Sequence, residues 1–185
     1  MTMNFTKKQI ESLLKELGHK LLQDGVIGEI GIVGGAAMVL AYAAREATRD
    51  VDAVFKPAAL IRAAVKQIAA EHDLPEDWLN DGVKGFMPGT PALQTTIIDV
   101  PGLRAWVPEP QYMLAMKAMS ARVDSKDTDD LRFLIKFLKI KSPDVVFDLI
   151  KKYYPDSEIP VKTQYFVQEL CNDLKNTGVR RKRQR

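Results

Sequence analysis

The sequence predicts a mixed α/β (α+β) fold: a small mixed β-sheet of about four strands flanked by helices, followed by a helical C-terminal part. Three observations support this class. Apolar residues at helical spacing open the chain, short apolar or β-branched stretches bounded by glycine and proline fill its middle, and only helical patterns follow Pro108. The expected parts are a core with an N-terminal helix at 1–107, a helical part at 108–178 packed on that core, and a basic tail at 179–185 that we expect to be disordered.

The first part should contain a helix at 5–24, whose leucines fall on one face and which Gly25 ends. A short buried strand at 29–35 then runs into a Gly-Gly turn. The remaining elements expected in this part are a helix at 36–47, a strand at 50–55, a helix at 57–72, a helical turn at 75–81, a loop at 82–91, and strands at 92–100 and 103–107.

The second part should be entirely helical. Ser142-Pro143 and Pro160 mark boundaries inside it. The helices expected there span 108–123, 126–140, 142–154 and 160–176.

Composition narrows the class of protein. With 46% hydrophobic and 28% charged residues, the 185-residue chain is expected to be soluble and globular. It has no apolar run near the roughly 20 residues that span a bilayer, so we expect no membrane partner. The amphipathic N-terminus lacks the apolar centre of a signal peptide, and Cys171 is the single cysteine. These features favour a cytoplasmic location.

The basic tail accounts for much of the net charge of +3. Its sequence, GVRRKRQR, is suited to holding a phosphate backbone by counterion release. The alternative is a solvated terminus without a ligand.

The stretch DVDAVF places two carboxylates on one predicted strand. Residues i and i+2 share a face of a strand, so Asp50 and Asp52 should project together while Val51 points into the core. Two carboxylates repel each other unless a cation lies between them, and Mg²⁺ prefers such oxygen ligands. The pair is therefore a candidate metal site, although aspartates at strand ends also occur without a metal.

Gly34 and Gly35 stand between the preceding strand and its helix. Without side chains, their backbone N–H groups can approach an anion, and the helix N-terminus adds positive potential. Glycines at such a turn can also serve geometry alone. Together with the acidic pair, however, they predict a cradle for a triphosphate next to a site for its metal ions.

The segment IVGGAAMVLAYAAREATRDVDAVF resembles the signature of the nucleotidyltransferase superfamily, which has the polymerase-beta-like fold: an apolar residue, Gly-Gly, a helix, and acid-x-acid on the next strand. It is most similar to the minimal, AbiEii-like nucleotidyltransferases, some of which are toxins of toxin–antitoxin pairs. The resemblance implies an NTP substrate, Mg²⁺ as two ions, and a third carboxylate from a later strand. Asp99 is the candidate for that carboxylate by position, although it also suits the turn before Pro101-Gly102.

A second block, 107–138, resembles the same group in carrying a lysine, an arginine, and "KD" with a further Asp entering the next helix. The matching positions are Lys117, Arg122, Lys126, Asp127 and Asp130. Lys117 and Arg122 would bind phosphates, and Asp127 would fix the lysine or orient a metal-bound water. An acidic helix-capping cluster is the alternative.

Thr48 and Arg49, just before the acidic pair, are further candidates for phosphate contacts, whereas Arg45 is equally suited to the surface.

These features predict a metal-dependent nucleotidyltransferase that moves a nucleotide from an NTP to an acceptor hydroxyl. The resemblance suggests RNA, such as a tRNA 3′ end, as the acceptor, with a protein hydroxyl as the alternative. It also suggests a cognate antitoxin or toxin as a partner. Two alternatives stay open: a catalytically inactive member of the fold that binds a nucleotide or a partner protein, and a nucleic-acid-binding domain that acts through its tail.

Overall fold

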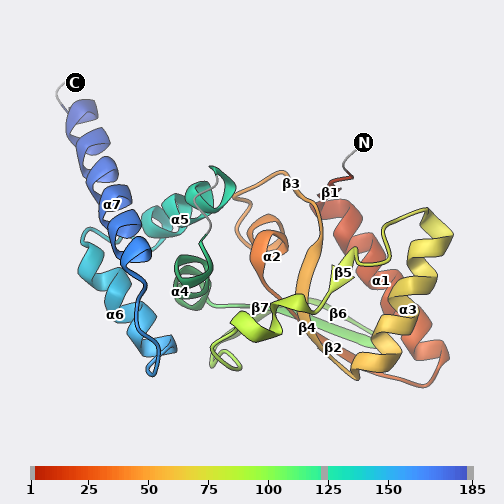
Figure 1. Cartoon of the computed structure of the whole chain (residues 1–185). Helices are drawn as coiled ribbons and strands as arrows, with labels where there is room; N and C mark the ends of the chain where they lie inside the picture. Colours follow the sequence, from red (N-terminus) through yellow and green to blue (C-terminus); the bar gives the residue numbers. More distant parts are fainter. Residues whose placement is uncertain (1–2, 122–124, 183–185) are drawn as a thin grey trace. The chain divides into compact units, whose positions relative to one another are not determined.

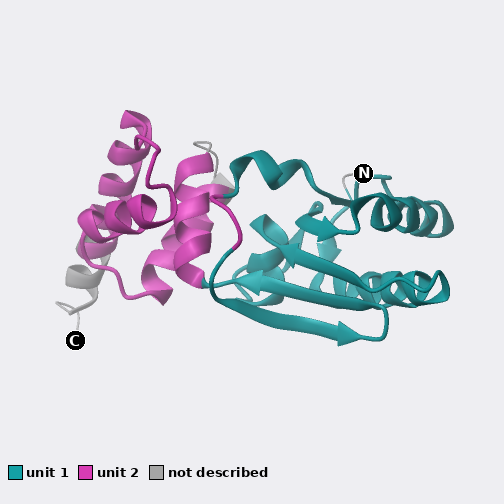
Figure 2. Cartoon of the chain, turned by 90° about the horizontal axis from the view of Figure 1, so that it is seen from below, with its two compact units in different colours: residues 1–87, 91–109 teal, residues 88–90, 110–185 magenta. Residues whose placement is uncertain are grey.

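The structure is a computed structural model that describes residues 3–121 and 125–182, with side chains at 3–121 and 127–175. The chain divides into two compact units (Figures 1 and 2). Unit 1 consists of residues 1–87 and 91–109, and unit 2 of residues 88–90 and 110–185. The main boundary at 109/110 lies two residues from the 107/108 boundary expected from the sequence.

Unit 1 is built on a five-stranded mixed sheet in the order β5-β4-β2-β7-β6. Its strands are β2 (Gly28–Ile32), β4 (Val51–Lys56), β5 (Leu79–Asn80), β6 (Gln94–Val100) and β7 (Leu103–Pro108). β2 runs antiparallel to β4 and parallel to β7, so the sheet is mixed as predicted. A separate two-stranded sheet joins β1 (Phe5–Thr6) to β3 (Ala47–Thr48). The predicted fold class is confirmed, with one more strand in the main sheet than the four expected.

Two helices, α1 (Lys7–Gln23) and α3 (Ala58–His72), cover one face of the main sheet. A Cβ added at Gly28 would touch Leu21 of α1 and Ile61 of α3, each within 3.2 Å. Every second residue of β2 and β4 points to the same side of the sheet as Gly28 and is buried there. These residues are Ile30, Ile32, Val51, Ala53 and Phe55. The core of unit 1 therefore lies between these helices and the sheet.

Trp106 covers the centre of the opposite face. Its ring lies on the backbone of Gly31, where even a Cβ would overlap with the ring. The indole is 5% exposed and donates a hydrogen bond from Nε1 to Glu29 at 3.2 Å. A glycine in the central strand thus makes room for the largest side chain on this face.

Helix α2 (Gly34–Leu40) is shorter than predicted: it begins two residues earlier and ends seven residues before residue 47. Ala43 has a left-handed backbone (φ 49°), and the N–H of Ala44 donates back to the carbonyl of Met38 at 3.0 Å, which terminates the helix. The Leu40 carbonyl accepts a hydrogen bond from Lys7 Nζ at 3.0 Å. The chain is then free to form β3 before it enters β4.

The turn predicted to begin at Pro75 is present, but it is not helical and it does not extend to residue 81. Pro75 starts a tight turn closed by the Trp78 N–H, at 3.0 Å from the Pro75 carbonyl, and strand β5 follows. Because β5 has only two residues, it carries no periodic pattern that the sequence could reveal. The expected loop contains the 3₁₀ helix η1 (Gly82–Phe86).

Unit 2 is helical, as predicted. It contains α4 (Pro110–Ser120), α5 (Ser125–Phe137), α6 (Pro143–Tyr153) and α7 (Val161–Lys182). Ser142 caps α6 by accepting from the Asp144 N–H at 3.3 Å. The backbone of α7 continues into the predicted basic tail as far as Lys182.

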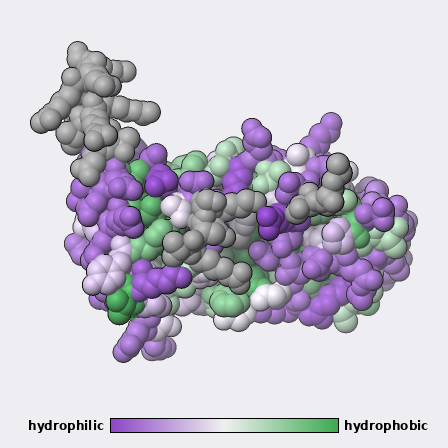
Figure 3. Space-filling model, turned by 45° about the horizontal axis from the view of Figure 1, so that its top comes forward, coloured by the Kyte–Doolittle hydropathy of each residue, from purple (hydrophilic) through white to green (hydrophobic). Residues whose placement is uncertain are grey.

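None of the helices in the described part of the chain is both long and apolar enough to cross a membrane. On the face shown in Figure 3, hydrophilic residues predominate and hydrophobic residues are scattered among them.

We expect Gly31→Ala to lower the free energy of unfolding by about 1–3 kcal/mol, because the new methyl group must displace the Trp106 ring. The control is Gly85→Ala in η1, where an added Cβ has no atom within 4 Å. Chemical denaturation followed by tryptophan fluorescence measures both. Equal stability of the two variants would contradict the close packing of Trp106 on β2.

Candidate active site

The Gly-Gly turn and the acidic strand are in direct contact. Gly34 has a left-handed backbone (φ +62°), and a Cβ at this position would lie 2.8 Å from Asp52 Oδ2. The Val33 N–H donates to the Asp52 carbonyl at 2.9 Å. Both backbone conformation and the neighbouring carboxylate thus require glycine at residue 34. The structure thereby brings together two of the features that the sequence singled out.

Gly35 faces the segment that leads into β4. A Cβ at Gly35 would lie 2.6 Å from Thr48 Oγ1 and 3.4 Å from Arg45 Nη1. Thr48 is buried and pairs with Phe5 across the β1–β3 ladder. The turn is therefore held between Asp52 on one side and the Thr48 and Arg45 side chains on the other.

The two candidate carboxylates have different surroundings. In β4, Val51 and Ala53 are fully buried while Asp52 is partly exposed, which is the alternation expected from the sequence. Asp50 immediately precedes the strand and is exposed. Partial desolvation, followed by the negative charge of Asp77, raises the pKa of Asp50, and the nearby Arg49 opposes this shift. Negative charge is thus concentrated at the start of β4.

Asn80 is a site residue that the sequence analysis missed. In the β4–β5 register it is the partner of Asp52, so both side chains leave the same face of the sheet. Its Oδ1 accepts a hydrogen bond from the Gly82 N–H at 3.1 Å. The next residue, Asp81, binds Arg62 at 2.5 Å and also Lys84, which fixes the chain after β5. The two-residue strand has no pattern that would have placed Asn80 there.

The carboxylates at the start of β4 suit a metal ion that takes its remaining ligands from a substrate. Among the described residues, no group of three or more His, Cys, Asp or Glu side chains is arranged to hold a metal ion. Mg²⁺ commonly takes only one or two protein carboxylates and completes its shell with water and substrate phosphates. The residues of this region that could hold such an ion are Asp50 and Asp52. Helix α2 has only seven residues, so the positive potential expected at its N-terminus is not part of the proposed site.

Asp99 does not join this pair. In the strand register Asp99 lies opposite Arg104 of β7, and Arg104 in turn lies opposite Glu29 of β2. Asp52 is hydrogen-bonded to Val33, which lies four residues after Glu29. Four residues along a strand correspond to about 13 Å, and two further strands separate β4 from β6. The expected approach of Asp99 to the acidic pair is therefore not seen.

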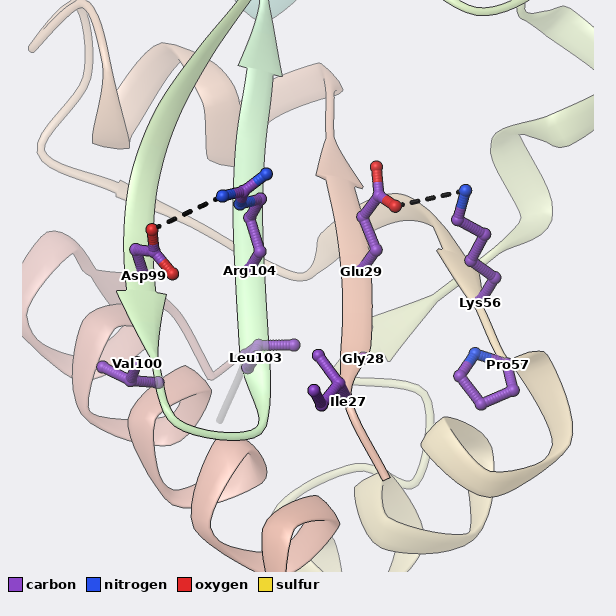
Figure 4. A pocket seen from close by; sticks show the side chains of 9 residues that line it. All are labelled: Ile27, Gly28, Glu29, Lys56, Pro57, Asp99, Val100, Leu103 and Arg104. Carbon is purple, nitrogen blue, oxygen red and sulfur yellow. Dashed lines mark ion pairs between the residues drawn. The ribbon is translucent and has the colours of Figure 1, made fainter. Parts of the chain in front are cut away.

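Asp99 belongs instead to a ladder of charges that crosses the sheet (Figure 4). Asp99 lies 3.7 Å from Arg104, and Glu29 lies 3.1 Å from Lys56. Together with Pro57 and Leu103 these side chains line a shallow pocket of about 570 Å³. Each cation of the pocket has a carboxylate partner, and the hydrogen bond from Lys56 is the main reason that the pKa of Glu29 is lowered.

Lys117 and Asp127 lie in unit 2, where they form part of a buried ion-pair cluster. Lys117 Nζ is 2.5 Å from Asp130 and 3.5 Å from Asp127. Lys117 is 5% exposed and Asp130 is 1% exposed. The cluster connects α4 to α5, and its carboxylates balance the ammonium charge, as the sequence suggested for Asp127. Arg122 lies outside the described residues, as does the side chain of Lys126.

Comparison with known proteins identifies the family. A family described as "Nucleotidyltransferase of unknown function (DUF6036)" matches residues 8–165. No curated protein and no solved structure gives a significant match.

Substitution of Gly34 tests the contact with Asp52. We expect Gly34→Ala to be less stable than Gly25→Ala, because both residues have positive φ but only Gly34 faces a side chain within 4 Å. The left-handed backbone alone should cost each variant about 1–2 kcal/mol. In thermal unfolding, Gly25→Ala should keep any stabilisation by Mg²⁺ and ATP, and Gly34→Ala should lose it. Identical behaviour of the two variants would count against a role for the Gly34–Asp52 contact.

Substitution of Lys117 tests whether this residue stabilises unit 2 or binds the substrate phosphates. Lys117→Met should cost about 3–5 kcal/mol, because it removes the ammonium that lies 2.5 Å from the buried carboxylate of Asp130. The double variant Lys117→Met/Asp130→Leu should recover most of this loss in urea denaturation. We expect the double variant to keep its nucleotide transfer activity, because the partners of Lys117 are the carboxylates of unit 2. A double variant that folds but transfers no nucleotide would contradict this and favour the phosphate-binding role that the resemblance implies.

Proposed function

Because the chain belongs to this nucleotidyltransferase family, we propose that it transfers a nucleotide from an NTP to an acceptor hydroxyl with the help of Mg²⁺. The observation that carries the proposal is the contact between Gly34 and the carboxylate of Asp52. It puts a backbone surface free of side chains beside a carboxylate, the kind of oxygen ligand that Mg²⁺ prefers. A triphosphate with its counterions needs both.

Asp50 and Asp52 are the proposed ligands for Mg²⁺, and the substrate phosphates would supply further oxygen ligands. Bound Mg²⁺ would neutralise the phosphate oxygens and favour an ionised acceptor hydroxyl. Asp52 is positioned by β4, and the mutual repulsion of Asp50 and Asp77 would fall when a cation binds. Asn80, beside Asp52 in the register, offers an amide oxygen at the same face.

The glycines and their neighbours hold the phosphates in this proposal. The triphosphate would lie against the backbone of Gly34 and Gly35. Thr48 packs against Gly35, and Arg49 supplies a positive charge beside Asp50. We assign Lys117 and Asp127 to the stability of unit 2, where they form an ion pair. Asp99 stays outside the proposed metal site because two strands separate β6 from β4.

The acceptor in this proposal is RNA, with a tRNA 3′ end as the first candidate. It is supported by the resemblance of the Gly-Gly and acid-x-acid segment to toxin-like nucleotidyltransferases, which also makes an antitoxin or toxin a candidate partner. The acceptor supplies the attacking hydroxyl, and pyrophosphate leaves as the new phosphodiester bond forms.

Transfer from each of four α-labelled NTPs to total tRNA tests the proposal. Loss of a metal ligand removes several kcal/mol of charge stabilisation, so Asp50→Asn and Asp52→Asn should each slow transfer by on the order of 100-fold or more. Asp99→Asn is the matched control and should stay within a few-fold of the original chain. Label on the protein itself would point to a protein acceptor. No transfer, and no Mg²⁺-dependent NTP binding, would contradict the proposal and favour an inactive binding protein.

A further inference from the structure

We propose that the side-chain hydroxyl of Thr48 donates a hydrogen bond to a phosphate oxygen of the NTP at the Gly-Gly turn, an inference that rests on the proposed function. The sequence makes Thr48 one of several candidates for a phosphate contact. Three features single it out: its burial, the lack of a partner for its hydroxyl among the described residues, and the place of that hydroxyl beside Gly35.

Thr48 is buried, yet within the described part of the chain its hydroxyl has no hydrogen-bond partner. The residue is 6% exposed, and its strand pairs with β1 through the backbone. Among the same described residues, every fully buried side-chain nitrogen or oxygen has a partner. The Oγ1 atom is therefore the place where Thr48 reaches the surface. A hydroxyl that has lost most of its water costs free energy until a ligand supplies the missing partner.

The other buried polar side chains that the structure describes are satisfied within the protein. Thr163 in α7 is also 6% exposed, but its Oγ1 donates to the Ala118 carbonyl at 3.4 Å. Lys117 and Asp130 bind each other. Thr48 differs from all three, which indicates that the partner of its hydroxyl is a bound molecule.

The hydroxyl lies on the turn that holds the phosphates in the proposed function. A Cβ on Gly35 would lie 2.6 Å from Thr48 Oγ1, and a Cβ on Gly34 would lie 2.8 Å from Asp52 Oδ2. The turn thus has a hydroxyl on one side and a proposed ligand for Mg²⁺ on the other. Because a phosphate oxygen can only accept a hydrogen bond, the hydroxyl would donate to it.

The two-stranded sheet holds Thr48 in place (Figure 1). Thr48 lies opposite Phe5, which is 2% exposed and packs its ring on Trp78. The next residue of β1, Thr6, leads into α1 and donates its backbone N–H to the Gln9 side chain at 2.9 Å. Since Thr48 is fixed before the ligand binds, little conformational freedom is lost on binding.

The test compares the binding of ATP and of inorganic tripolyphosphate, each with Mg²⁺, by isothermal titration calorimetry. Thr48→Val replaces the hydroxyl by a methyl group of similar shape and should weaken binding of both ligands by about tenfold, as expected for one hydrogen bond to a charged group. The Tm of the free variant should stay the same or rise, because the hydroxyl has no partner among the described residues. Thr48→Ser restores the hydroxyl and should recover most of the binding.

Thr163→Val is the matched control, because Thr163 is equally buried but its hydroxyl has a partner in unit 2. This variant should have a lower Tm and unchanged ATP binding. The same behaviour in Thr48→Val, a lower Tm with unchanged ATP binding, would make Thr48 a structural residue and overturn the inference.

The remaining outcomes separate the inference from the proposed function. A loss of ATP binding with tripolyphosphate binding unchanged would assign the hydroxyl to the nucleoside and overturn the inference. A loss confined to a labelled single-stranded RNA, measured by anisotropy, would assign it to the acceptor and overturn it as well. If the original chain transfers nucleotides and Thr48→Val binds ATP normally, the proposed function stands without this contact. If Thr48→Val loses ATP and tripolyphosphate binding but the original chain transfers no nucleotide, the contact stands and the proposed function fails.

Discussion

The close approach of the Asp52 carboxylate to Gly34, where an added Cβ would lie 2.8 Å from Oδ2, is the constraint on which the path from β2 to β4 depends. It requires the chain to leave β2 in a left-handed turn, form a short helix, and return beside its starting point within eighteen residues. A side chain at Gly34 would meet the carboxylate, and a longer α2 would leave less chain for β3. The short α2 and the left-handed Ala43 both follow from this return.

The N-terminal strand β1 stabilises the segment between α2 and β4 by pairing with β3. β1 pairs with β3, so Phe5 lies opposite Thr48, and the Phe5 ring packs on Trp78 with centroids 6.3 Å apart. The Trp78 carbonyl in turn accepts from the Val51 N–H at 2.7 Å, between the two candidate metal ligands. Thr48, Asp50 and Asp52 are thereby held by segments from three parts of the chain, which gives the site a rigid base.

The sequence predicted those parts of the fold that have a repeating pattern. The leucine face of α1, the alternation in β4 and the helices of unit 2 have enough residues to show their period. It did not predict the end of α2, because Ala41, Ala43 and Ala44 are compatible with a helix and only the hydrogen bond from Lys7 and the turn at Ala43 end it. Strand β5 is too short to have a period, and Asn80 was missed with it. The position of Asp99 depends on strand register, which no local pattern encodes.

The most direct test of the account is the position of a bound metal. Crystals grown with Mn²⁺ and a non-hydrolysable ATP analogue would locate the metal by its anomalous scattering. The account predicts a manganese peak at Asp50 and Asp52, with the triphosphate against the backbone of Gly34 and Gly35. Manganese at Glu29 and Asp99, or a nucleotide bound away from the Gly-Gly turn, would contradict it.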